Sequence, residues 1–138
     1  MTSSNAPLVL VLDEDRDELT DLYLFLDREG YLVATRANAL DALKYLSERK
    51  PGIIVLGEAA RPLSLRALVS KIWEISPATQ VLVLEGREGH RDPEETVSDP
   101  RVLILRRPAP RESFAERFTL AVRRLAHRLL SPTPLPAA

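Results

Sequence analysis

Five short apolar runs divide the chain at similar intervals. Four are apolar at every position: Leu8 to Leu12, Ile53 to Leu56, Val81 to Leu84 and Val102 to Leu105. Strands have this composition when both of their faces are buried, as in a parallel sheet that is covered on two sides. A weaker run, Tyr31 to Thr35, follows the first helical segment. The pattern therefore predicts five strands.

Segments between and after these runs have helical spacing. An amphipathic helix places its apolar residues at i, i+3, i+4 and i+7, where they share one face. The apolar sets are Leu19, Leu22, Tyr23 and Leu26; Ala39, Ala42, Leu43 and Leu46; Leu65, Leu68, Val69 and Ile72; and, on a last helix from about Arg111 to Leu130, Phe114, Phe118, Ala121 and Leu125. Each set predicts a helix with one buried face.

Residues with known capping roles mark the helix boundaries. Gly30 stands where a C-terminal glycine would close the first helix, Asn38 can cap the second, and Pro51 stops that second helix. A further helix is expected at Asp92 to Glu95, which combine an N-cap, a first-turn proline and an acid at the third position. Asp99 and Pro100 end it after about two turns.

Alternation of strands and helices indicates a parallel sheet with helices on both of its faces. The expected fold is α/β, a doubly wound five-stranded parallel sheet with five helices. Residues 8–130 of the 138-residue chain form this domain. Residues 1–7 are expected to be disordered, and the proline-rich tail 131–138 to be disordered or the stub of a linker, because it cannot continue the last helix.

The carboxyl ends of the strands are where ligands bind in doubly wound sheets. The residues that follow the apolar runs are therefore the candidates for a functional site. They are Asp13, Glu14 and Asp15 after the first strand, Gly57 after the third, Glu85 after the fourth and Arg107 after the fifth.

From Leu8 to about Leu129 the chain resembles the bacterial response-regulator receiver domain, whose CheY-like, flavodoxin-like topology implies the strand order 2-1-3-4-5. The resemblance implies that Asp13 and Glu14 correspond to a pair of acids that holds Mg²⁺. It also implies an aspartate after the third strand that accepts a phosphoryl group from a histidine kinase. Gly57 stands at that position instead.

Three further positions depart from the receiver pattern. The resemblance implies a threonine or serine at Glu85, and a lysine at Arg107, which keeps the following Pro108. It implies an aromatic residue on the fifth strand, where this chain has Ile104. The chain is therefore expected to be an atypical receiver, or pseudo-receiver, that keeps the scaffold without most of the reactive residues.

Glycine has no side chain with which to form an acyl phosphate, a step that needs a carboxylate close to a divalent cation. Its presence also removes one oxygen ligand, and Mg²⁺ demands near-ideal octahedral oxygen geometry. We expect weak Mg²⁺ binding at Asp13 and Glu14 at most, no cofactor and no enzymatic activity. Glu58 is a poor substitute, because neighbouring strand residues point to opposite sides.

Arg107 suggests a hypothesis for the altered pocket. With Glu85, or with Asp13 and Glu14, it would form a permanent ionic bridge where a receiver holds phosphate, since a guanidinium and a carboxylate form strong paired hydrogen bonds. The alternative is that the acids of Asp13 to Glu18 favour a helix N-terminus, while Arg106 and Arg107 belong to a solvated loop. Both interpretations stay open.

Composition limits the partners. A net charge of -1 gives no general attraction to nucleic acid or anionic membranes, and no apolar run approaches the ~20 residues of a membrane span. The absence of cysteine and of a signal peptide suits the cytoplasm. Arg117, Arg124 and Arg128 on the last helix are interpreted as a solvated face, so we expect no nucleic-acid binding.

The resemblance places the contact surface for a protein partner or a second copy on the fourth helix, the fifth strand and the last helix. We interpret the chain as a pseudo-receiver that signals through protein–protein interaction without phosphorylation, in a bacterial two-component-type pathway. Two alternatives remain: a phosphorelay receiver with an unusual acceptor acid, and a small-molecule-binding domain of another doubly wound family.

Overall fold

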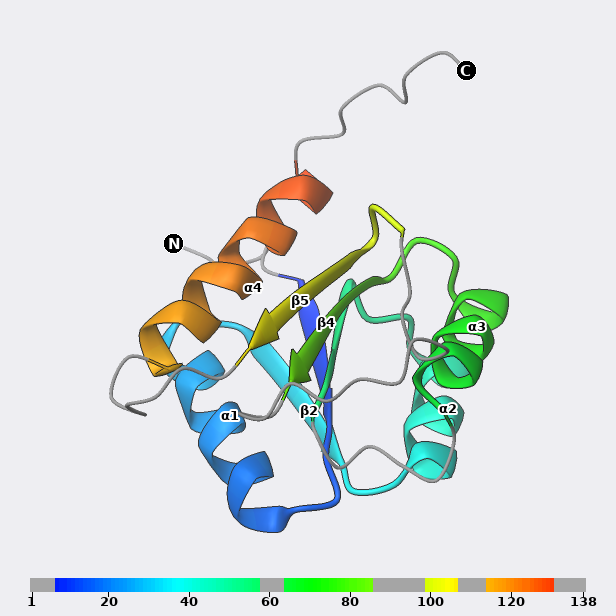
Figure 1. The fold of residues 1–138 in the computed structure, drawn as a ribbon, viewed down its shortest axis with the longest axis horizontal. Helices are drawn as coiled ribbons and strands as arrows, with labels where there is room; N and C mark the ends of the chain where they lie inside the picture. Colours follow the sequence, from blue (N-terminus) through cyan, green and yellow to red (C-terminus); the bar gives the residue numbers. More distant parts are fainter. Residues whose placement is uncertain (1–6, 58–63, 86–98, 107–113, 131–138) are drawn as a thin grey trace.

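The computed structural model describes residues 7–57, 64–85, 99–106 and 114–130. Its centre is a five-stranded parallel sheet with the strand order β2-β1-β3-β4-β5, as expected (Figure 1). The strands are β1 (Leu8–Leu12), β2 (Leu32–Arg36), β3 (Ile53–Leu56), β4 (Gln80–Glu85) and β5 (Val102–Arg106). All five strands predicted from the apolar runs are confirmed.

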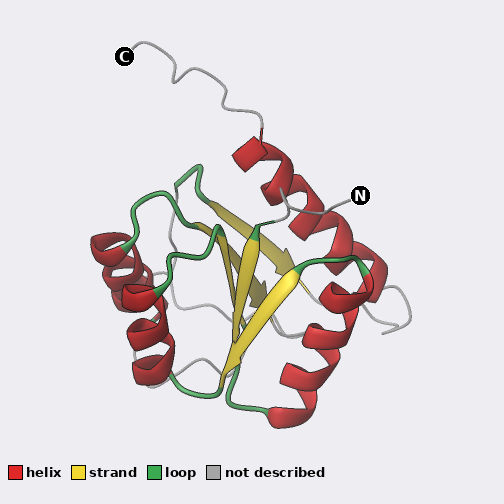
Figure 2. Ribbon diagram, turned by 180° about the vertical axis from the view of Figure 1, so that it is seen from behind, coloured by secondary structure: helices red, strands yellow, loops and turns green. Residues whose placement is uncertain are grey.

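The described residues contain four helices, α1 (Arg16–Arg28), α2 (Ala39–Glu48), α3 (Leu65–Ile75) and α4 (Phe114–Leu130). Figure 2 shows α1 and α4 against one face of the sheet and α2 and α3 against the other, which confirms the doubly wound arrangement. Five helices were expected. The missing one, from Asp92, falls in 86–98, outside the described residues. The expected terminal segments, 1–7 and 131–138, also lie outside them, apart from Pro7.

Two apolar clusters lie on the two sides of the sheet. Alternation along each strand sends Val9, Val11 and Val55 to the side of α1 and α4, and Leu12 and Leu56 to the side of α2 and α3. Phe25 of α1 meets Phe114 and Phe118 of α4 with ring centroids 6.4 and 6.2 Å apart. The three inner strands β1, β3 and β4 are buried because helices cover both faces, as their continuous apolar sequences predict, whereas β5, which has a similar sequence, is only half-buried at the edge of the sheet.

The predicted helix caps are present. Gly30 has a φ of 88°, a conformation that favours glycine, and its N–H donates to Asp27 O at 3.0 Å. The N–H of Tyr31 donates to Leu26 O at 3.2 Å, which completes a Schellman motif. This bond explains why β2 starts at Leu32 rather than at Tyr31. At the start of α2, Asn38 Oδ1 accepts from the N–H of Asp41 at 2.8 Å.

None of the helices within 7–57, 64–85, 99–106 and 114–130 has both the length and the apolar composition that a membrane span requires.

Candidate functional site

The parallel register brings the ends of β1 and β3 to the same level. Leu12 pairs with Leu56, so Asp13 and Gly57, the next residues, lie side by side at the carboxyl edge of the sheet. The N–H of Gly57 donates to Leu12 O at 2.8 Å, and the N–H of Asp13 donates to Arg36 O at 3.2 Å. Backbone hydrogen bonds therefore hold both residues in position beyond the last apolar pair.

Asp13 and Glu14 do not form a common carboxylate pair facing solvent. Asp13 is buried, with 1% of its surface exposed, whereas Glu14 is exposed. Oδ1 of Asp13 accepts a hydrogen bond from the N–H of Asp15 at 2.9 Å. A buried carboxylate needs such donors, because its charge loses the solvation that water would supply. Asp13 is thus directed into the protein and toward the start of α1.

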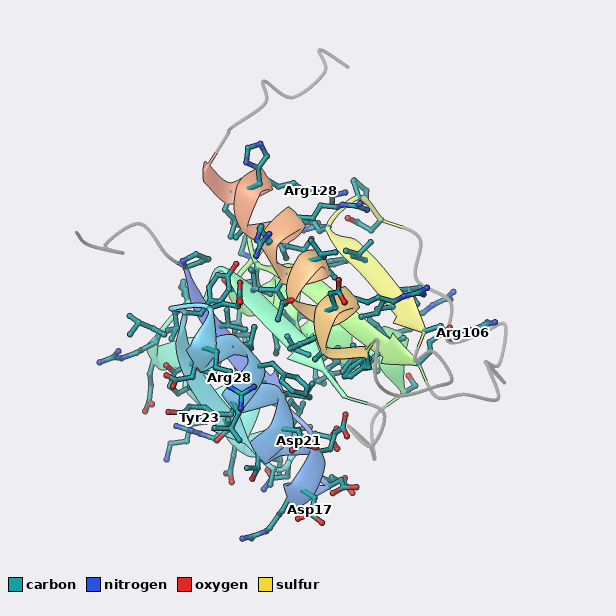
Figure 3. The ribbon with its side chains drawn as sticks, turned by 90° about the vertical axis from the view of Figure 1, so that its left-hand side faces the viewer. Asp17, Asp21, Tyr23, Arg28, Arg106 and Arg128 are labelled. Atoms are coloured by element: carbon teal, nitrogen blue, oxygen red, sulfur yellow. The ribbon has the colours of Figure 1, made fainter. Side chains whose placement is uncertain are left out.

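Asp15 is the N-cap of α1. Its Oδ1 accepts hydrogen bonds from the N–H groups of Asp17 at 3.0 Å and Glu18 at 3.2 Å. Both of these acids lie in the first turn of the helix, where their negative charges interact favourably with the positive end of the helix dipole. The expected role of the acids after β1 in favouring a helix N-terminus is therefore present. Figure 3 shows Asp17 and Asp21 on the outer side of α1.

Gly57 has no room for a side chain beside Asp13. A Cβ atom built on Gly57 would overlap Asp13 Oδ2 and would lie 2.5 Å from its Cγ and 2.9 Å from its Cβ. Real Cβ atoms essentially never approach other atoms below 3.0 Å. The carboxylate of Asp13 therefore occupies the space where a side chain of residue 57 would begin. The sequence did not reveal this close approach, which follows from the register of β1 and β3 in the folded sheet.

Glu85 is the last residue of β4, and its register partner on β5 is Arg106. Arg106 Nε lies 3.6 Å from Glu85 Oε1, so Glu85 has a guanidinium partner that the sequence interpretation missed. The side chain of Glu85 is 11% exposed and that of Arg106 is 64% exposed. Figure 3 shows Arg106 at the end of β5. Arg107, for which a bridge to Glu85 or to Asp13 and Glu14 was one of two open interpretations, lies outside the described residues.

Strand alternation separates this ion pair from Asp13. Glu85 comes two residues after Val83, whose side chain packs on the α2 and α3 side, whereas Asp13 comes two residues after Val11, on the α1 and α4 side. Ile104, at the position where the resemblance implies an aromatic residue, is half-buried and packs on the α2 and α3 side. The candidate residues therefore divide between the two sides of the sheet edge.

No group of three or more His, Asp or Glu side chains capable of holding a metal ion is present within the described ranges. Asp13 and Glu14 alone would supply at most two side chains, and only Glu14 faces solvent. Hard cations such as Mg²⁺ need about six oxygen ligands. The described donor set does not fit a tightly held Mg²⁺ ion.

The arginines of α4 lie on its exposed face. Arg117, Arg124 and Arg128 are all exposed, as predicted for a solvated face. Arg123 Nη2 forms an ion pair with Glu29 Oε1 at 2.9 Å, and Arg128 Nη1 donates to Pro100 O at 2.8 Å. Figure 3 shows Arg128 toward the end of α4. These contacts connect α4 to the end of α1 and to the turn that precedes β5.

Solved structures with the same fold are receiver domains. The response regulator receiver protein of Sinorhizobium medicae superimposes with a TM-score of 0.70 at 21% identity, over 88% of this chain and 95% of that one. The receiver domain of NtrX from Brucella abortus gives 0.68 at 25% identity, over 86% and 98%. The beryllofluoride-activated NtrC4 receiver domain dimer gives 0.69 at 24% identity, over 88% and 97%. The fold is therefore that of a CheY-like response-regulator receiver domain.

Curated proteins with similar sequences are transcriptional regulatory proteins. The transcriptional regulatory protein PrrA of Mycobacterium tuberculosis is 32% identical over 91 residues, which are 66% of this chain and 39% of that protein. AfsQ1 of Streptomyces coelicolor is 44% identical over 50 residues, 36% of this chain and 22% of that protein. The chain spans less than half the length of the curated relatives it matches. No protein-family model matches it.

Proposed function

We propose that this chain is a pseudo-receiver, a non-enzymatic signalling domain that acts through protein–protein interaction without aspartyl phosphorylation. The observation that carries the proposal is Gly57 at the carboxyl end of β3, with the buried carboxylate of Asp13 in the space that its side chain would need. We further expect the domain to act in the cytoplasm of a bacterial cell, in a two-component-type pathway.

The chemistry of phosphoryl transfer supports the proposal. A carboxylate nucleophile must reach the phosphorus atom, while a cation neutralises the phosphoryl oxygens. Gly57 contributes only backbone atoms at the required position, and Asp13 is 1% exposed. Glu14 is the one exposed acid of the pair. A transfer reaction at this edge would thus have neither the nucleophile nor the oxygen ligands that it needs.

A partner surface on β5 and α4 is part of the proposal. β5 is an edge strand of the sheet, and its residues Val102 to Leu105 are only half-buried. On α4, Leu120 is 53% exposed among arginines that face solvent. An apolar side chain within a charged rim is a common arrangement for a protein contact. The helix that was expected from Asp92 would belong to the same surface, and it lies outside the described residues.

Incubation with acetyl phosphate and Mg²⁺ tests the proposal. Intact-mass spectrometry is expected to show no gain of a phosphoryl group, while a receiver domain that carries the acceptor aspartate gains one in the same reaction. A phosphoryl gain that hydroxylamine removes would show an acyl phosphate and would favour an unusual acceptor acid. The variant Glu14→Gln would then show whether that acid is the exposed one.

A further inference from the structure

The backbone of Gly57 does not require glycine. Among the described residues, positive φ angles occur only at Gly30, so Gly57 has a conformation open to other amino acids. Its requirement for glycine is steric, because the three atoms nearest to an added Cβ all belong to Asp13. The side chain at position 57 and the inward position of the Asp13 carboxylate exclude each other.

Asp13 also connects this position to α1. The backbone N–H of Asp15 donates a hydrogen bond to Asp13 Oδ1 at 2.9 Å, and this bond holds the backbone of Asp15 in place. The side chain of Asp15 in turn caps α1 through the N–H groups of Asp17 and Glu18. A side chain at position 57 would displace the Asp13 carboxylate and remove the bond that positions the cap. Gly57, Asp13 and Asp15 thus form a short chain of contacts from the end of β3 to the start of α1.

We infer that the Asp13 carboxylate acts as a plug: it fills the space that the absence of a side chain at Gly57 leaves beside β3, and it holds the N-terminus of α1 in one arrangement. The carboxylate of Asp13 thus fills the space next to the strand end at which a receiver carries its acceptor aspartate. An acid placed at position 57 would first have to displace the Asp13 carboxylate from this space.

This inference rests on the proposed function and deepens it, since it says which side chain fills the space beside Gly57. Its test is separate, because it uses the unphosphorylated protein. If wild-type protein gains a phosphoryl group while Asp13 and Gly57 prove coupled, the proposed function falls and the plug stands. If the wild type stays unmodified while the two residues prove independent, the plug falls and the proposed function stands.

A double-mutant cycle with Gly57→Ala, Asp13→Ala and the double variant measures the coupling. Gly57→Ala is expected to lower the Tm by roughly 5 °C, because overpacking in a buried site is destabilising. In the Asp13→Ala background the same change is expected to cost less than about 2 °C, since the overlapping carboxylate is gone. Equal losses in both backgrounds would overturn the inference.

Amide hydrogen exchange distinguishes the plug from a general loss of stability. Gly57→Ala is expected to speed exchange at the amides of Asp15, Asp17 and Glu18 by roughly tenfold. Gly52→Ala is the matched control. Gly52 directly precedes β3 at its other end, and an added Cβ there would lie 2.8 Å from Leu129 Cδ1. It should lower the Tm without a selective effect at the three amides. Unchanged exchange at these amides in Gly57→Ala would contradict the plug.

Gly57→Asp provides a functional readout. With acetyl phosphate and Mg²⁺, this variant is expected to gain no phosphoryl group. Isothermal titration is expected to show that it binds Mg²⁺ no more tightly than the wild type does. Its fold is checked by circular dichroism. A folded Gly57→Asp variant that becomes phosphorylated would show that the Asp13 carboxylate moves away easily from residue 57, and the inference would then be wrong.

Discussion

Arg101 lies over the indole ring of Trp73, with its guanidinium carbon 3.6 Å from the ring centroid. The same guanidinium donates from Nε and Nη2 to the two carboxylate oxygens of Asp99, at 2.9 Å each, and from Nη1 to Pro77 O at 2.9 Å. Trp73 itself donates from Nε1 to Thr79 O at 3.0 Å. One arginine before β5 thus joins α3, the turn before β4 and its own turn.

Arg101→Ala is expected to lower the free energy of unfolding by about 2 kcal/mol, because it removes a stacking contact and a bidentate ion pair together. For a chain of this size the Tm should fall by about 6 °C. Thermal unfolding followed by circular dichroism measures it. Arg124→Ala, which removes an exposed arginine of α4, is the matched control and should change the Tm by less than about 2 °C. Similar losses in the two variants would contradict the expectation.

Asp99 makes part of this stability depend on pH. The hydrogen bonds from Arg101 hold the pKa of the Asp99 carboxyl below its usual value, and they raise the pKa of Arg101. A carboxyl with a lowered folded-state pKa stabilises the fold above its unfolded pKa of about 3.9, and this contribution is lost as the pH falls through the lower, folded value.

Urea unfolding at about pH 6 and about pH 3 tests this pH dependence. Wild-type protein is expected to lose more stability between the two conditions than Asp99→Asn, which cannot titrate at that position. Arg101 stays charged at both pH values, so the difference reports Asp99 alone. Identical losses in wild type and Asp99→Asn would show that the ion pair does not contribute.

The Glu85 and Arg106 pair is expected to contribute little to stability. Its closest distance is 3.6 Å and the arginine is 64% exposed, so solvent screens the attraction and a mobile side chain must be ordered to form it. Arg106→Ala should therefore reduce the free energy of unfolding by less than about 0.5 kcal/mol, as measured by urea denaturation. A loss above about 1 kcal/mol would indicate that the pair fixes the end of β4 to β5.

Leu120 tests the proposed contact surface on α4. Leu120→Asp is expected to weaken association of the chain with a second copy by roughly tenfold, because an exposed apolar side chain at an interface is replaced by a charge. Sedimentation velocity over a concentration series measures it. Leu40→Asp, at an 80% exposed position of α2, is the control and should leave association unchanged. Equal behaviour of the two variants would remove α4 from the surface.

Local sequence signals predicted much of the fold. Gly30 and Asn38 act within their own turns, so their capping roles follow from the chain on either side of them. The strand β2 was displaced by one residue, because the N–H of Tyr31 is used by the glycine cap rather than by the sheet. Trp73 packs at the periphery of the core, and its partner Arg101, which directly precedes β5, was not foreseen.

The sequence by itself determined the five strands, their order of alternation with helices, and the absence of a carboxylate at Gly57. Periodicity and capping are local, and parallel strands must end at a common edge, so the site residues were found from their place after each strand. Only the tertiary structure decided that Asp13 turns inward to the space beside Gly57 and that Glu85 meets Arg106. Both contacts join residues that are distant in sequence. Which side chain fills the space between two neighbouring strands depends on the packing of the folded chain, which the local sequence does not contain.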